Sequence, residues 1–209
     1  MDINSIDIAR YYAMQKTPEY IQGRCYESAF KIYNPAVHNR EPYTQGRGLR
    51  RSPFWQREEE LGGYFMELAG WERAHGYAAN EHLLEKYADQ VPVRENEWDN
   101  RHFWRVSNAE HLAMSEGVGM INLSHFAVYD VSGNDAETLM EYACVAKVGG
   151  TTAIGKGIYT HFLDQEGGVR ADLTVLRLAE DRFRIVDGAD AGNRDCVWLQ
   201  RMAQDHNWS

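Results

Sequence analysis

The most restrictive feature of this chain is a run of three β-prone segments between residues 158 and 187, joined by short turns. The segment GIYTHFL is followed by the turn DQEGG, the segment VRADLTVLRL by AED, and the third segment is RFRIVDG. Alternating polar and apolar residues and β-branched or aromatic enrichment predict strands, and such short turns join neighbouring antiparallel strands. The run therefore predicts a three-stranded antiparallel meander.

The middle segment of the meander carries an acidic residue where strands seldom have one. On alternation, one face holds Val169, Ala171, Leu173 and Val175, and the other holds Arg170, Asp172, Thr174 and Leu176. Aspartate is disfavoured in strand interiors. Asp172 is either a solvated residue on an exposed face or a carboxylate at a pocket wall, where it could hydrogen-bond an amine or stabilise a cation.

The rest of the chain supplies helices and one more strand. A helix is predicted from Pro53, with Phe54, Leu61, Tyr64, Phe65 and Leu68 on one side. The S-x-x-E box at Ser107 predicts a second helix start, and HFAVYDV reads as a strand. Ser132 with Asp135 repeats the capping pattern ahead of a helix that presents Ala136, Leu139, Met140 and Ala143 on one face. A last helix, DAGNRDCVWLQRMAQ, completes an α+β fold with an antiparallel sheet and helices on one side.

Residues 1–50 differ in character from residues 51–209. They begin with a tyrosine-rich stretch that predicts one or two helices. The connector PAVHNREPYTQGRGLRRSPFW then runs from residue 35 across residue 50 to residue 55. Such a lead is too short to bury a core of its own. We expect it to be a helical extension that packs on the main body or on a partner.

The composition of the chain argues against several classes of function. The net charge of −9 argues against a nucleic-acid partner, and no apolar run is long enough to span a membrane. The three cysteines lack metal-type spacing, which indicates a reducing compartment and leads us to expect a cytoplasmic protein. His125 and His161 sit at strand positions, but an unrelated histidine pair is more often structural than metal-binding, so no metal is expected.

The stretch GTTAIGKG, residues 150–157, approaches a phosphate-binding loop. Gly157 stands where such a loop has Ser or Thr, and Lys156 leads into a predicted strand. A phosphate loop requires a helix there, so that backbone N–H groups face the phosphates. We expect no nucleotide site, and interpret Lys156 as a solvated loop charge.

Four segments, in order, resemble one family: RRSPFWQREEELGGYFMELAGWER, EHLAMSEGVGMINLSHFAVYDVSGNDAETLM, GKGIYTHFLDQEGGVRADLTVLRLAEDRFRIV and RDCVWL. They are similar to the tetrahydrofolate-binding region of the glycine-cleavage aminomethyltransferase (T-protein) superfamily. The likeness is strongest to the branch that follows a flavin domain in dimethylglycine and sarcosine dehydrogenases and oxidases. Residues 1–50 resemble the end of that flavin domain.

The resemblance implies site residues. The family motif G-G-[IV]-x-x-D-L matches residues 167–173 and implies that Asp172 is the acidic residue at the reactive end of folate. It implies that Tyr159, in KGIYT, lines the folate site and that Phe126, after NLSH, forms the pterin wall. Asp187, in IVD where the T-protein has VVN, is implied as a weaker pterin contact. Asn122 replaces the family's usual Asp at a position that we interpret as structural.

The resemblance also implies a function. A flavin partner carrying FAD would oxidise a small N-methylated amine, and tetrahydrofolate held by this chain would take up the one-carbon unit as 5,10-methylene-tetrahydrofolate. The family's folate domain continues beyond the matched segments, so we expect a fragment or subunit, inactive alone. A flavin-containing oxidoreductase subunit and a chain with the second half of the folate domain would be its partners in a hetero-oligomer. The alternatives are a non-catalytic subunit that docks a flavin protein, and flavin-independent methyl transfer to tetrahydrofolate.

Overall fold

The computed structural model describes residues 11–209, which fold into two compact units. One unit holds residues 126–209 together with Tyr11 and Tyr12, and the other holds residues 13–125. Residues 13–50 therefore pack with residues 51–125, and the structural division lies between His125 and Phe126. The part of the tyrosine-rich lead before residue 11 lies outside the described residues.

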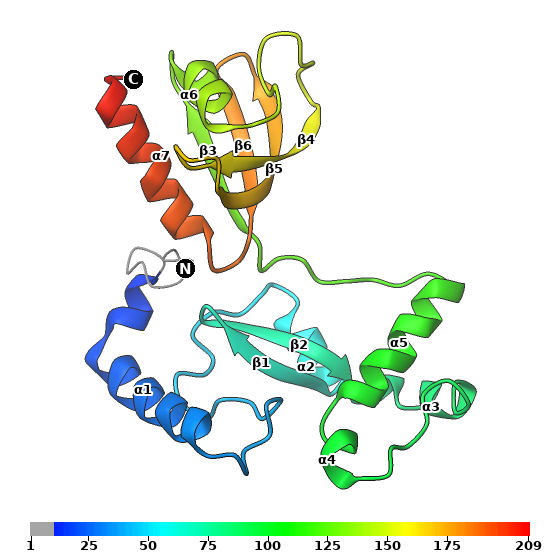
Figure 1. The fold of residues 1–209 in the computed structure, drawn as a ribbon. Coiled ribbons are helices and arrows are strands. Elements are labelled where there is room, and N and C mark those ends of the chain that lie inside the picture. Colours follow the sequence, from blue (N-terminus) through cyan, green and yellow to red (C-terminus); the bar gives the residue numbers. More distant parts are fainter. Residues whose placement is uncertain (1–10) are drawn as a thin grey trace. The chain divides into compact units, whose positions relative to one another are not determined.

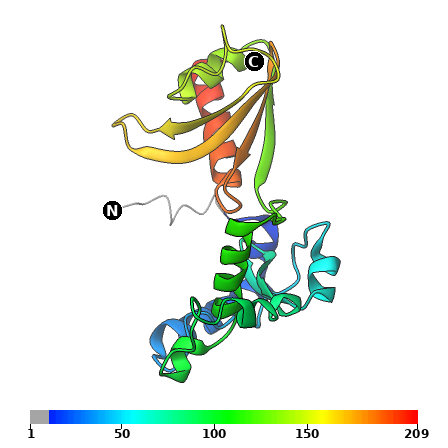
Figure 2. The same ribbon diagram turned by 90° about the vertical axis from the view of Figure 1, so that its right-hand side faces the viewer.

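The unit of residues 126–209 is a four-stranded antiparallel sheet with helices on one face (Figures 1 and 2). The strand order is β3-β6-β5-β4, where β3 is Ala127–Ser132, β4 is Gly157–Leu163, β5 is Val169–Ala179 and β6 is Arg182–Asp187. The predicted meander is confirmed as β4, β5 and β6, and strand β4 follows Lys156 directly. The strand predicted over HFAVYDV is confirmed for its residues 127–131, which lie on β3 at the other edge of the sheet.

The core of this unit lies between the sheet and its two helices. Helix α6 (Ala136–Ala143) buries the four residues predicted to share a face, and helix α7 (Gly192–His206) buries Leu199. The sheet contributes the inward positions of its alternating strands, among them Phe162, Ala171, Leu173, Val175, Phe183 and Ile185. Helix α7 comes so close to β3 that a Cβ on Gly192 would lie 2.1 Å from that of Ala127.

The unit of residues 13–125 is built around a two-stranded hairpin of β1 (Gly63–Leu68) and β2 (Trp71–Tyr77). The 3₁₀ turns η3 (Ala13–Lys16) and η4 (Ala78–Asn80) and five helices accompany it. The helices are α1 (Pro18–Tyr33), α2 (Trp55–Glu60), α3 (Leu83–Lys86), α4 (Glu97–Asn100) and α5 (Trp104–Glu116). Its apolar core is small, with Tyr87, Val91 and Ala109 at the centre. Much of its cohesion must therefore come from polar contacts.

The helix predicted from Pro53 is wrong beyond residue 60. Helix α2 ends at Glu60, and Gly62 follows with a φ of 71°, a left-handed conformation that suits glycine and breaks the helix. Tyr64, Phe65 and Leu68 then lie on β1, where pairing with β2 supplies the hydrogen bonds that a helix would have made within itself.

Both predicted capping boxes are also wrong. Helix α5 begins at Trp104, which places Ser107 within its first turns, where its hydroxyl donates to the carbonyl of His75. Ser132 is the last residue of β3, and Asp135 caps α6 without a side-chain hydrogen bond to the helix. Its carboxylate accepts instead from the backbone and hydroxyl of Ser209, at 2.9 and 3.1 Å. Ser107 and Asp135 thus bond to residues distant in the sequence instead of capping the helices as predicted.

Candidate functional site on the open face of the sheet

The face of the sheet away from α6 and α7 carries the tyrosine–aspartate pair singled out in the sequence. Asp172 lies in the middle of β5 and Tyr159 on β4, and the tyrosine hydroxyl donates to Asp172 Oδ2 at 2.9 Å. The strands pair His161 with Asp172 and Tyr159 with Thr174, so the tyrosine reaches the carboxylate diagonally. The structure brings these two predicted site residues together.

The carboxylate is tolerated at mid-strand because its face is open. Ala171 and Leu173 are buried in the core, whereas Asp172 is exposed and Tyr159 is 63% exposed. The hydrogen bond to the Asp172 carboxylate raises the pKa of the Tyr159 phenol. Since that bond uses one of roughly four lone-pair positions on the carboxylate, Asp172 can still accept hydrogen bonds from a ligand.

Phe126 lies directly before β3 and is 44% exposed. Ala127 pairs with Asp187 and Thr174 with Val186, so Phe126 and Asp172 both lie toward the Asp187 end of β6. That Phe126 forms a wall of the site stays a prediction.

Asp187 does not join this group, because it points to the helix-covered face. It follows buried Phe183 and Ile185 in the alternation of β6 and is 3% exposed. Burial, and then the neighbouring Asp195 carboxylate to which it hydrogen-bonds, raises the pKa of Asp187 to about 7. The Tyr129 hydroxyl donates to Asp187 Oδ2 at 3.3 Å and the Gly188 N–H to Oδ1 at 2.7 Å.

Asp195, the partner of Asp187, was not among the site residues predicted from the sequence. Asp195 is fully buried in the first turn of α7, and Arg194 donates to both of its oxygens at 2.8 Å. The guanidinium of Arg170, from β5, lies 3.5 Å from Asp195 Oδ1. The available signal was the helical spacing of Asp195 with Leu199, which places a charge at a core position of α7.

Asn122 has a structural explanation in the other unit. Its amide nitrogen donates to Glu58 Oε1 at 3.0 Å and to Ser52 Oγ at 2.8 Å, and Glu58 is 5% exposed. A carboxylate at this position could not donate these two hydrogen bonds, whereas the amide can. That the position is structural stays a prediction.

The two histidines considered as a pair occupy different places in the fold. His125 is buried edge-on to Trp71, with 5.6 Å between ring centroids, and His161 lies beside Tyr159 at 5.4 Å. Across residues 11–209, no group of three or more His, Cys, Asp or Glu side chains is arranged to hold a metal ion. In the same residues no helix combines the length and apolar character needed to cross a bilayer.

Comparisons with known proteins agree with this architecture. Residues 54–209 match the GCVT N-terminal domain family, and residues 1–52 match the FAD dependent oxidoreductase central domain. Aminomethyltransferase T of the glycine cleavage system from Bartonella henselae has a similar fold, with a TM-score of 0.53 and 23% identity over 75% of this chain and 36% of that one. The α+β prediction with an antiparallel sheet is confirmed.

Two curated relatives extend the comparison to longer proteins. A 4-methylaminobutanoate oxidase (formaldehyde-forming) from Paenarthrobacter nicotinovorans is 30% identical over 97% of this chain and 23% of its own length. An aminomethyltransferase from Burkholderia multivorans is 34% identical over 50% of this chain and 28% of its own length. The chain thus spans about a quarter of the length of these relatives.

The resemblance read from the sequence motifs is confirmed by these matches. The region that carries Asp172, Tyr159 and Phe126 falls within the GCVT match, and the helical lead falls within the flavin-oxidoreductase match. Residues 1–52 match the FAD dependent oxidoreductase central domain, and since the GCVT match alone covers well over half of the chain, the protein belongs to the GCVT N-terminal domain family.

Proposed function

We propose that this chain is the folate-binding part of a flavin-dependent enzyme that demethylates a small N-methylated amine. The one-carbon unit would pass to tetrahydrofolate and leave as 5,10-methylene-tetrahydrofolate. Support comes from the joined flavin-oxidoreductase and GCVT matches. It also comes from a relative that is named as a formaldehyde-forming oxidase of a methylamino acid.

The observation that carries the proposal is the Tyr159–Asp172 hydrogen bond on the open face of the sheet. A pterin is a flat heterocycle that displays N–H donors along its edge. Asp172 offers free carboxylate lone pairs to such donors, and Tyr159 and Phe126 offer exposed aromatic surface to the rings. The residues present therefore fit this ligand class.

The proposed chemistry assigns a distinct task to each residue. Tetrahydrofolate, when bound, supplies the nucleophilic amine that takes up the one-carbon unit, and FAD, on the oxidoreductase side, accepts the electrons removed from the substrate amine. Asp172 hydrogen-bonds the amine N–H and stabilises the positive charge that develops there. Tyr159 holds the Asp172 carboxylate in place through its hydroxyl. Phe126 covers part of the site and limits access of water, which favours capture of formaldehyde equivalents over their loss.

The test is Asp172→Asn in the complete flavin-containing protein. We expect coupled formation of methylene-tetrahydrofolate to fall on the order of 10²-fold or more, because a charged hydrogen bond at the reacting centre is lost. Amine oxidation, followed by flavin reduction in the absence of folate, should stay nearly unchanged. Both rates are measured on the same preparation.

Asp130→Asn is the matched control, since Asp130 is a carboxylate on the same sheet face that is engaged by Arg182 and Arg184. This control should leave methylene transfer intact. Unchanged coupling in Asp172→Asn would reject the assignment of Asp172. Failure of the wild-type protein to bind tetrahydrofolate at all would favour the alternative of a non-catalytic subunit.

A further inference from the structure

Helix α1 packs on its own unit through charged side chains. Arg24, Glu27 and Lys31 recur at three- and four-residue spacing, and their side chains are only 11, 11 and 15% exposed. No residue of α1 is fully buried, and no apolar side chain of the helix belongs to the apolar core around Tyr87. We call the face that carries these three residues the inner face.

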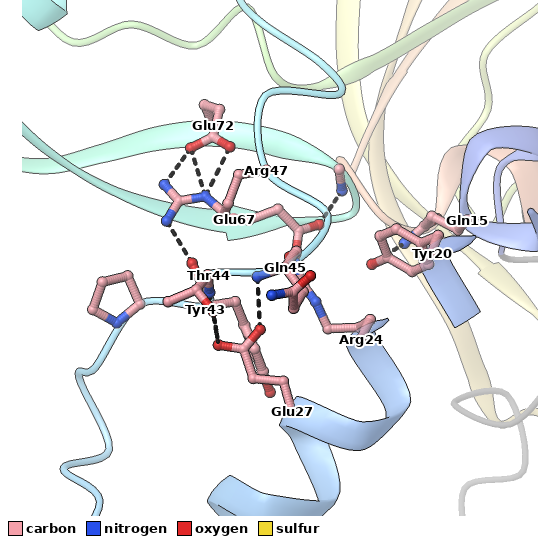
Figure 3. A network of polar contacts seen from close by, with 12 residues as sticks. Gln15, Tyr20, Arg24, Glu27, Tyr43, Thr44, Gln45, Arg47, Glu67 and Glu72 are labelled. Carbon is pink, nitrogen blue, oxygen red and sulfur yellow. Dashed lines mark hydrogen bonds and ion pairs between the residues drawn. The ribbon is translucent and has the colours of Figure 1, made fainter. Parts of the chain in front are cut away.

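The inner face is held by a dense set of polar contacts (Figure 3). Arg24 pairs with Glu67 of β1 and donates to the carbonyl of Gln45 at 2.6 Å. Glu27 accepts from the backbone N–H groups of Thr44 and Gln45 at 2.6 and 2.8 Å. Burial alone would raise the pKa of Glu27, but these hydrogen bonds outweigh it and lower that pKa.

The far end of the inner face and the loop beneath it are fixed in the same way. Lys31 donates to the carbonyls of Glu41 and Pro42 at 3.1 and 2.6 Å, and its ammonium lies 4.3 Å from the centre of the Tyr43 ring. The loop itself is held by Arg47, whose Nε donates to Glu72 Oε1 at 2.9 Å and whose Nη1 donates to the Tyr43 carbonyl at 2.7 Å. The orientation of α1 is therefore specified by directional bonds along its length.

A row of aromatic side chains on α1 is turned away from the inner face. Tyr26, Phe30 and Tyr33, which we call the outer stripe, follow one another at four- and three-residue spacing and are 79, 56 and 85% exposed. Since a large aromatic side chain can bury roughly 150–250 Å², the stripe presents on the order of 500 Å² to solvent. Such a patch is comparable to the largest expected on a monomeric protein.

The helix is thus inverted relative to an ordinary surface helix, which buries its apolar face and solvates its charges. Rotation about its axis cannot correct this, because it would bury the stripe at the cost of ion pairs that are already desolvated. An apolar face that is held outward by satisfied charges is suited to burial against a second body.

We propose that the outer stripe of α1 is the docking surface for the body of a flavin-binding oxidoreductase domain, in the same polypeptide or in a separate one. The helix lies wholly within residues 1–52, the part that matches the FAD dependent oxidoreductase central domain. The inner face joins that segment to the GCVT-family hairpin β1–β2, and the outer stripe faces the flavoprotein. This inference rests on the flavin partner of the proposed function.

The first test measures flavin retention in the natural flavin-containing protein, with Tyr26→Asp and Phe30→Asp singly and together. A charge in a desolvated aromatic anchor position is expected to weaken association roughly 30-fold or more, as for other interface hot spots. If the flavin body is fused, the same loss appears as faster proteolysis at the domain boundary. Both side chains are more than half exposed within their own unit, so the variants should fold as the wild type does and give the same circular dichroism spectrum.

Val93→Asp is the matched control, because it places the same charge on a 67% exposed apolar residue of the same unit, away from α1. It should leave association intact. The second test replaces Tyr26 with a photo-crosslinking benzoylphenylalanine and maps the products by mass spectrometry. Crosslinks to the flavin-binding polypeptide support the proposal.

Crosslinks only to α1 of a second copy would overturn the proposal in favour of self-association. Stripe variants that associate as tightly as the wild type would also overturn it. Tetrahydrofolate binding is measured separately on each variant. Suppose the wild type binds tetrahydrofolate and converts it to methylene-tetrahydrofolate, while the stripe variants still retain the flavin body. That result would refute the docking surface without contradicting the proposed function.

Discussion

Replacing Asp187 by Asn should change how the stability of the protein depends on pH. Asp187 is buried against Asp195, and its pKa is raised to about 7 by burial and by that neighbour. The folded protein keeps the Asp187 proton up to about pH 7, whereas an unfolded aspartate releases it near pH 4. Between these values the folded state binds more protons, so the free energy of unfolding falls as the pH rises.

The size of the effect follows from the separation of the two pKa values. About three pH units at about 1.4 kcal/mol each give a loss of up to roughly 4 kcal/mol between pH 4 and pH 7. An asparagine has no proton to lose, and its amide can still donate to Asp195 and accept from Tyr129. The free energy of unfolding of the Asp187→Asn variant, relative to that of the wild type, should therefore increase as the pH rises.

Urea denaturation of both proteins at pH 5 and pH 8 measures this difference. Because about two of the three pH units lie between pH 5 and pH 7, the variant should be favoured by about 2–3 kcal/mol more at pH 8 than at pH 5. Asp130→Asn is the control, because Arg184 and Arg182 lower the pKa of Asp130 to about 2, below the range tested. An Asp187→Asn difference that is equal at the two pH values would refute the argument that the buried carboxyl holds a proton.

Three further predictions concern other parts of the chain. Lys156→Ala should leave calorimetric titration with Mg²⁺–ATP unchanged from a wild type that shows no binding, because β4 follows the lysine where a phosphate loop needs a helix. Gly192→Ala should lower the free energy of unfolding by roughly 1–3 kcal/mol in urea, since its Cβ would overlap that of Ala127. Arg47→Met should cost about 3–5 kcal/mol by leaving Glu72 buried without its partner, and the double variant Arg47→Met with Glu72→Met should recover much of that loss in the same assay.

The sheet of residues 126–209 was predictable because local signals and tertiary packing agree there. Alternation assigns the faces of β5, and turns such as DQEGG fix antiparallel order before any long-range contact is considered. The apolar spacing of α6 likewise describes the face that it buries. Each of these sequence patterns is local, and no contact with a distant residue overrides it in the structure.

The hairpin β1–β2 was not predictable from the same kind of signal. Tyr64, Phe65 and Leu68 suit a helix face as well as a strand, and the deciding features are distant in sequence. Glu67 and Glu72 of the hairpin are held by arginines from α1 and from the following loop, more than twenty residues away. Period alone carries no information about such partners.

Some features of the candidate site were likewise predictable from local sequence signals, and others depend on distant partners. That Asp172 faces away from the core follows from alternation, but its hydrogen bond to Tyr159 depends on the register of β4 against β5, which includes a shift between Phe162 and Leu163. The direction of Asp187 also follows from alternation in β6, once the helices are known to cover the face of Phe183 and Ile185. The buried Asp195 had no strong local signal, because its neutralising arginines come partly from β5.

Strand β5 shows why these two carboxylate environments remain separate. Alternate residues such as Leu173 build the core, while Asp172 faces the open side. A slip of one residue in its pairing would bury that carboxylate and expose the core residues. The cost of burying an unpaired charge, several kcal/mol, opposes such a slip strongly. The residue proposed for catalysis therefore also helps to fix the register that positions it. A carboxylate at this place is compatible with a stable sheet only while its face stays open to solvent or to a ligand that hydrogen-bonds it.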